Sequence, residues 1–265
     1  MVFSWLRERR RRRLLTEPFP EGWRAVLRER VRHYQYLNDA QRERLEGFVQ
    51  VVASEKDWAG GGGFKLTDEM KVTIAGYAGV MTLGLSEPYY FDRLHTIIVY
   101  PGGYVAQRSK FDVQPLFEPA DDRLGEAWHR GPVVLSWAEI AGDKRRRPGD
   151  NLVFHEFAHH VDGLAGDIDG VPPMTNWNQE RTWYHVTEQE FDRLVHDARR
   201  GEATLLDQYG ATNRAEFFAV ATECFFERPR AMRDRHPELY HVLAEFYCQD
   251  VAKWLLDAMA PRRAP

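Results

Sequence analysis

The chain has 265 residues, of which 43% are hydrophobic and 29% charged, with a net charge of −4. Its 15 Phe, 8 Trp and 11 Tyr exclude a largely disordered polymer, and its apolar runs are well short of the ~18–20 residues that a membrane-spanning helix needs. The net charge gives no overall nucleic-acid signature. Two cysteines exclude a disulfide framework and suit a reducing compartment, so we expect a cytoplasmic protein.

The N-terminus carries six arginines between Arg7 and Arg13, after a short apolar stretch. A secretory signal has the opposite order, with the charge first and a longer apolar segment after it, so we expect no export. We predict that residues 1–15 form a solvated basic tail. The alternative is a weak anchor for anionic lipid or nucleic acid.

From Glu21 to about Ala53 the apolar residues recur at helical spacing. Four glycines, Gly60 to Gly63, then predict a flexible turn. A capping signal at Thr67 begins another predicted helix, to about Leu83. Two β-branched, apolar runs are predicted strands: residues 96–100 and residues 133–137. No repeat or linker divides the chain after residue 60.

The segment from Asp150 to Gly163 carries the clearest chemical signal. It contains His155-Glu156-Phe157-Ala158-His159, and residues four apart lie on one face of a helix. Two imidazoles so placed can share one tetrahedral Zn²⁺ ion. Glu156, one step round the helix, can reach a water at the metal without binding the metal itself. We predict metal binding, against the alternative that both histidines only satisfy hydrogen bonds.

A catalytic zinc site normally has three protein ligands, so a third must lie downstream. Glu216 is the best candidate, because it lies in an apolar helical segment where an uncompensated carboxylate is costly. The alternative is a capping box, in which Glu216 only returns to Asn213. Glu223, two helical turns further on, and Asp162, one turn after His159, are candidates to orient a ligating imidazole. Structural ion pairs are the alternative for both.

These residues carry a family resemblance. It rests on the segment from His155 to His159 with Val161-Asp162, and on Tyr209-Gly210-x-Thr212-Asn213-x-Ala215-Glu216-Phe217-Phe218-Ala219. Both resemble the Mlc titration factor A family, bacterial zinc-dependent peptidases whose active site is related to the protease domain of anthrax lethal factor. The likeness covers most of the chain from about Leu14 to Leu256, and we do not match the arginine run to it.

The resemblance implies the roles of the site residues. It implies that His155, His159 and Glu216 bind zinc, that Glu156 is the general base, and that Tyr209 faces the site and stabilises the oxyanion. Glu223 would then lie behind the metal ligands.

The resemblance also implies a zincin-like α+β metallopeptidase domain, with a small mixed sheet and active-site helices. We expect it to span residues 16–265, with residues 16–60 as an N-terminal helical part. An edge strand of such a domain can pair with an extended peptide. Our candidate is the predicted strand Val133, Val134, Leu135, Ser136 and Trp137, which precedes the metal helix.

We therefore expect a zinc-dependent peptidase, with an aminopeptidase-like mode as one form of it, acting on a peptide or protein substrate. The alternative implied by the family name is a regulatory protein that sequesters a transcriptional repressor, with peptidase activity secondary.

Overall fold

The computed structural model describes residues 2–102, 131–142 and 149–254. Its N-terminal helices are α1 (Val2–Thr16), α2 (Glu21–Arg30), α3 (Asp39–Glu55) and α4 (Asp68–Val80), with a 3₁₀ turn, η1 (Arg32–Tyr36), between α2 and α3. Nearly all of α4 is buried, and α2 and α3 pack against it. Gly79 permits the approach of α3, since a Cβ at this position would lie 2.5 Å from the side chain of Leu45.

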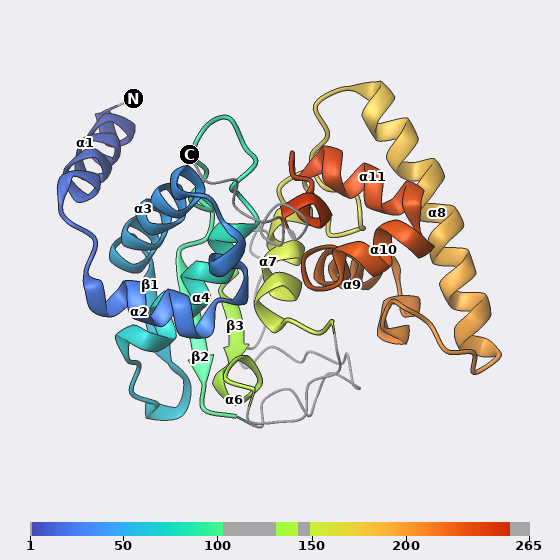
Figure 1. Cartoon of the computed structure of the whole chain (residues 1–265), viewed down its shortest axis with the longest axis horizontal. Helices are drawn as coiled ribbons and strands as arrows, with labels where there is room; N and C mark the ends of the chain where they lie inside the picture. Colours follow the sequence, from blue (N-terminus) through green and yellow to red (C-terminus); the bar gives the residue numbers. More distant parts are fainter. Residues whose placement is uncertain (1, 103–130, 143–148, 255–265) are drawn as a thin grey trace, which may run out of the picture.

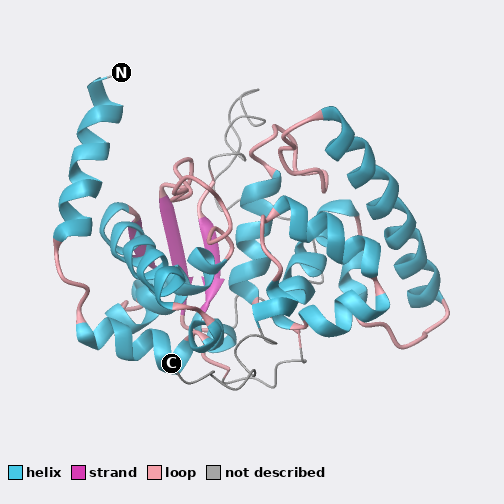
Figure 2. Cartoon of the chain, turned by 45° about the horizontal axis from the view of Figure 1, so that its top comes forward, coloured by secondary structure: helices cyan, strands magenta, loops and turns pink. Residues whose placement is uncertain are grey.

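Three strands form the sheet of the described part, in the order β1 (Asp57–Gly60), β2 (Thr96–Tyr100) and β3 (Val133–Ser136), and both pairs are parallel. The expected mixed sheet is therefore wrong for these strands. Helices lie on both sides of the sheet (Figure 2). The α+β class is confirmed.

After the sheet come α6 (Trp137–Ile140), α7 (Leu152–Asp162), the long α8 (Trp177–Arg199), the 3₁₀ turn η4 (Gln208–Ala211), α9 (Arg214–Glu227), α10 (Pro229–Arg235) and α11 (Pro237–Phe246). Figure 1 shows α7 in the middle of the molecule, between the N-terminal helices with the sheet and the C-terminal helices α8–α11. It packs against α4, β3 and α9. The rings of Phe154 on α7 and Phe226 on α9 stack, with their centroids 4.8 Å apart.

The N-terminal segment differs from the predicted solvated tail in two respects: residues 2–16 form helix α1, and Arg11 is only 5% exposed. The Arg11 guanidinium donates to Glu55 at 2.7 Å and to Asp92 at 2.6 Å. An arginine with two carboxylate partners tolerates burial, so it can hold a helix against the body of the protein. The other described arginines of the run are exposed.

Two further boundaries differ from the predictions. Gly60 ends β1, and Gly61–Gly63 form a 3₁₀ turn (η2), where the sequence predicts a flexible turn. Trp137 begins α6 and so lies outside the strand predicted over residues 133–137. Within the described ranges, no helix is both long and apolar enough to cross a bilayer.

Candidate metal centre

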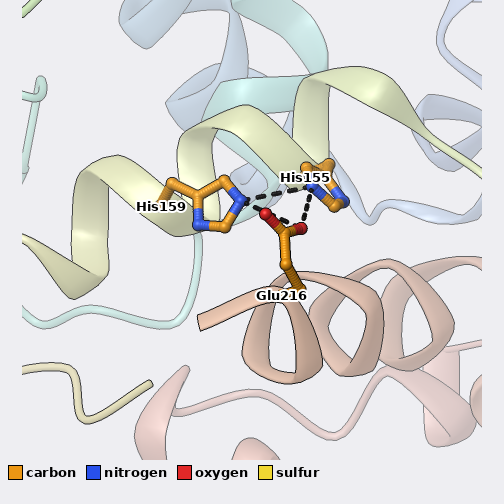
Figure 3. A group of neighbouring side chains, drawn as sticks. All are labelled: His155, His159 and Glu216. Carbon is orange, nitrogen blue, oxygen red and sulfur yellow. Dashed lines mark hydrogen bonds and ion pairs between the residues drawn. The ribbon is translucent and has the colours of Figure 1, made fainter. Parts of the chain in front are cut away.

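The first two residues of the site come from α7. Asn151 begins this helix, because its Oδ1 accepts hydrogen bonds from the backbone N–H groups of Val153 and Phe154 at 3.1 and 3.4 Å. His155 and His159 lie one turn apart on the side of α7 that faces α9 (Figure 3), and their Nε2 atoms are 3.2 Å apart. His155 is 3% exposed.

The third residue comes from the first turn of α9. Asn213 caps this helix, since its Oδ1 accepts from the backbone N–H of Glu216 at 2.9 Å. The Glu216 carboxylate points at the two histidines, as Figure 3 shows, and it is 4% exposed. Its Oε2 lies 3.1 Å from Nε2 of His155 and 3.5 Å from Nε2 of His159. The Glu216 side chain therefore faces the histidines, while Asn213 caps the backbone.

The three side-chain atoms have the spacing of metal ligands. Ligands at ~2.0–2.1 Å from a tetrahedral Zn²⁺ lie about 3.3–3.4 Å from one another. The observed triangle has edges of 3.1, 3.2 and 3.5 Å. Among the described residues these three form the one group of His, Cys, Asp or Glu able to hold a metal ion. The donors, two imidazoles and a carboxylate, also fit zinc.

The electrostatics of the site favour a positive charge. Burial alone would lower the pKa of His155, but its hydrogen bonds to Glu216 and Glu223 raise it to about 9. Burial alone would raise the pKa of Glu216, yet its hydrogen bonds to the two histidines hold it well below the usual range. The carboxylates thus stabilise a cation at this point, either a proton on His155 or a metal ion.

Glu223 lies behind His155, where its Oε1 accepts from the imidazole Nδ1–H at 2.7 Å. A carboxylate at Nδ1 fixes the tautomer and directs the Nε2 lone pair outward, as in many metal-binding histidines. The other Glu223 oxygen accepts from the backbone N–H of Asn151 at 2.5 Å. Glu223 therefore ties the start of α7 to α9 beside the site.

Asp162, the other candidate to orient an imidazole, binds a backbone group of a loop. Its Oδ2 accepts from the backbone N–H of Gly170 at 2.8 Å, and burial raises the pKa of this carboxyl to about 7. The contact holds the loop that follows α7. Gly170 in turn accepts from Trp183 on α8 at 3.0 Å, and a Cβ at Gly170 would lie 2.5 Å from the carbonyl oxygen of Arg214, the first residue of α9.

Two other predicted residues lie close to the histidines. Tyr209 is on the turn η4, and its ring centroid is 6.1 Å from that of His155. Its backbone N–H donates to Asp207 at 2.8 Å, which fixes the turn. Glu156 is half-buried on α7, and its charge contributes to the raised pKa of His155.

Sequence reasoning missed two contributors. Besides capping α7, the Asn151 side chain donates to Glu227 at 2.8 Å. Glu227 in turn pairs with Arg32 at 2.6 Å. Hydrogen bonds across 72 and 76 residues leave no periodic signal, although three glutamates at positions 216, 223 and 227 of one mostly apolar helix do hint at a shared face.

Comparison with known proteins gives consistent matches. Residues 5–248 match the family described as glucose-regulated metallo-peptidase M90. The chain is 39% identical to the uncharacterized protein slr2042 of Synechocystis over 248 residues, which are 92% of this chain and 89% of that protein. It is 31% identical to Mlc titration factor A of Yersinia pestis over 220 residues, which are 81% of this chain and 80% of that protein.

Proposed function

The chain belongs to the glucose-regulated metallo-peptidase M90 family, and we propose that it is a zinc-dependent peptidase with its metal at His155, His159 and Glu216. The observation that carries the proposal is the triangle of donor atoms, whose edges match a tetrahedral zinc ion. The placement of a two-histidine helix beside a small sheet supports a zincin-like arrangement.

The chemistry that zinc supplies when bound is Lewis-acid activation of the scissile carbonyl and of the attacking water. Glu156 acts as the general base, takes a proton from the water and passes it to the leaving amine. Its place next to His155 on α7 supports this role. Tyr209 donates its phenol hydrogen bond to the oxyanion that develops on the carbonyl, and its ring beside His155 supports this.

Substrate binding is proposed at β3. In the described part of the chain β3 pairs with β2 alone, which makes it an edge of the sheet, and it packs against the metal-bearing α7. An extended peptide paired with Val133–Ser136 would be held by its backbone, with little demand on its side chains. An aminopeptidase-like mode is one form of this proposal.

A second candidate function is that of a binding protein that titrates a transcriptional repressor. The name of the Yersinia relative, Mlc titration factor A, favours it. The number of ligands argues against a purely structural metal site, because a structural zinc takes four protein groups. Within the described residues the group has three members.

Both cysteines are free thiols, which supports the proposed cytoplasmic location.

The test is metal analysis combined with hydrolysis of chromogenic amino-acid amides and N-terminally blocked peptides. We expect zinc-dependent cleavage that a chelator abolishes and added zinc restores. Cleavage of free but not blocked substrates would identify an aminopeptidase. A zinc-loaded protein that cleaves neither class would contradict the peptidase proposal and favour the binding protein.

A further inference from the structure

A chain of hydrogen bonds runs from the N-terminal helices to the back of His155. Arg32, on the turn η1, pairs with Glu227 at 2.6 Å. Glu227 accepts from Nδ2 of Asn151 at 2.8 Å, and the backbone N–H of Asn151 donates to Glu223, which accepts from His155. We infer that Asn151, held by Glu227, is a positioning residue that fixes the Glu223 carboxylate against His155. The inference rests on the proposed metal site.

The amide of Asn151 can take only one orientation. Its Oδ1 accepts from the first N–H groups of α7, and its Nδ2 donates to Glu227. A flipped amide would lose the cap and place an NH₂ group against those N–H groups. The residue is fully buried, so water cannot replace either contact without entering the core. Asn151 therefore fixes the position of the start of α7 relative to the last turns of α9.

The charges of α9 explain why this donor is needed. Glu223 and Glu227 are four residues apart and lie on the same face of the helix. Their side chains are 12% and 10% exposed, so their mutual repulsion is poorly screened. Each carboxylate must be compensated by hydrogen bonds or cations. Asn151 donates to both of them, one through its backbone and one through its side chain.

Loss of the side-chain donor should therefore loosen Glu223 and, through it, His155. The test variant is Asn151→Ser, because serine keeps an oxygen that can cap α7 but has no group that reaches Glu227. The matched control is Asn176→Ser, the same change at the cap of α8, which accepts from Gln179 and is exposed. The measurement is the zinc dissociation constant, from competition with a chelator, beside the Tm of the metal-free protein.

We expect Asn151→Ser to weaken zinc binding about 10-fold, the lower end of the range for groups behind metal ligands. Asn176→Ser should leave it unchanged. Glu223→Gln should weaken it about 10- to 100-fold, and Asn151→Ser should add little in that background, because the effect passes through Glu223. Equal zinc affinity in the two serine variants, or full additivity with Glu223→Gln, would overturn the inference.

A second pair of substitutions covers the case in which Asn151→Ser does not fold. It exchanges the hydrogen-bond donor and acceptor between positions 151 and 227. Asn151→Asp keeps the cap but sets a carboxylate against Glu227, so zinc binding should weaken more than 10-fold. Adding Glu227→Gln reverses the hydrogen bond, since the new amide donates to the new carboxylate, and should recover most of the loss. Absence of recovery would overturn the inference alone. A wild-type protein that binds no zinc would overturn both the inference and the proposed function.

Discussion

Glu223 accepts a hydrogen bond of 2.7 Å from His155, although the two residues are 68 positions apart in the sequence. The contact joins α9 to α7 on the side of the imidazole away from Glu216. Because both carboxylates belong to α9, this one helix holds His155 from two sides. The geometry of the site thus depends on how these two helices pack.

Glu156→Gln should retain zinc and lose about 10²- to 10⁴-fold in turnover, the usual contribution of a general acid–base group. The amide has nearly the same shape as the carboxylate but cannot take up a proton from water. Metal content and peptide hydrolysis should be measured on the same sample. A zinc-replete variant with wild-type turnover would remove Glu156 from the mechanism.

Tyr209→Phe should lower turnover about 10²- to 10³-fold, as the loss of one oxyanion donor does elsewhere. The ring remains, so its packing beside His155 and the zinc content should change little. Steady-state kinetics would show the loss in kcat rather than in KM. Unchanged kcat would mean that the phenol hydroxyl takes no part in the reaction.

Gly170→Ala should destabilise the protein by about 3 kcal/mol, because φ is +86° and the added Cβ would press on the Arg214 carbonyl at the start of α9. Gly201→Ala is the control. Its φ is +66° with open space around it, so only the backbone strain of about 1 kcal/mol applies. Denaturant unfolding of the two variants should separate strain from contact. Equal losses would show that the contact with α9 is unimportant.

Arg11→Gln should destabilise the protein by about 3 kcal/mol, because it leaves the Glu55 carboxylate, whose side chain is only 9% exposed, without its partner. Arg12→Gln, one residue along the same run and exposed, should change stability by less than about 0.5 kcal/mol. Urea midpoints measure both. If Arg11→Gln were as mild as Arg12→Gln, the docking of α1 through Arg11 would be refuted.

The sequence was most informative where the signal is local. A four-residue spacing is enough to place His155 and His159 on one helix face, and β-branched runs are enough to indicate β2 and most of β3. The strand β1 was missed because Asp57-Trp58-Ala59-Gly60 has no β-branched residue and runs into glycines. It is held by pairing with β2, which local sequence does not record.

Long-range relationships were harder to predict. From the residues alone Glu216 was the best candidate for the third ligand, with a capping box as the alternative, and the family resemblance strengthened the prediction that it is a ligand. Arg11 belongs to a run that is typical of a solvated segment, and its burial depends on Glu55 and Asp92, which lie 44 and 81 positions away. Asn151 combines a cap, which sequence can indicate, with a donor to Glu227, which it cannot.

The most direct test is the zinc content of the purified wild-type chain beside Glu216→Ala and Glu238→Ala. Glu238 is an exposed residue of α11 and serves as the control for loss of a carboxylate. We predict one equivalent of zinc in the wild type and in Glu238→Ala, and a loss of most of it in Glu216→Ala. A Glu216→Ala protein that is folded and keeps a full equivalent would contradict the proposed metal centre.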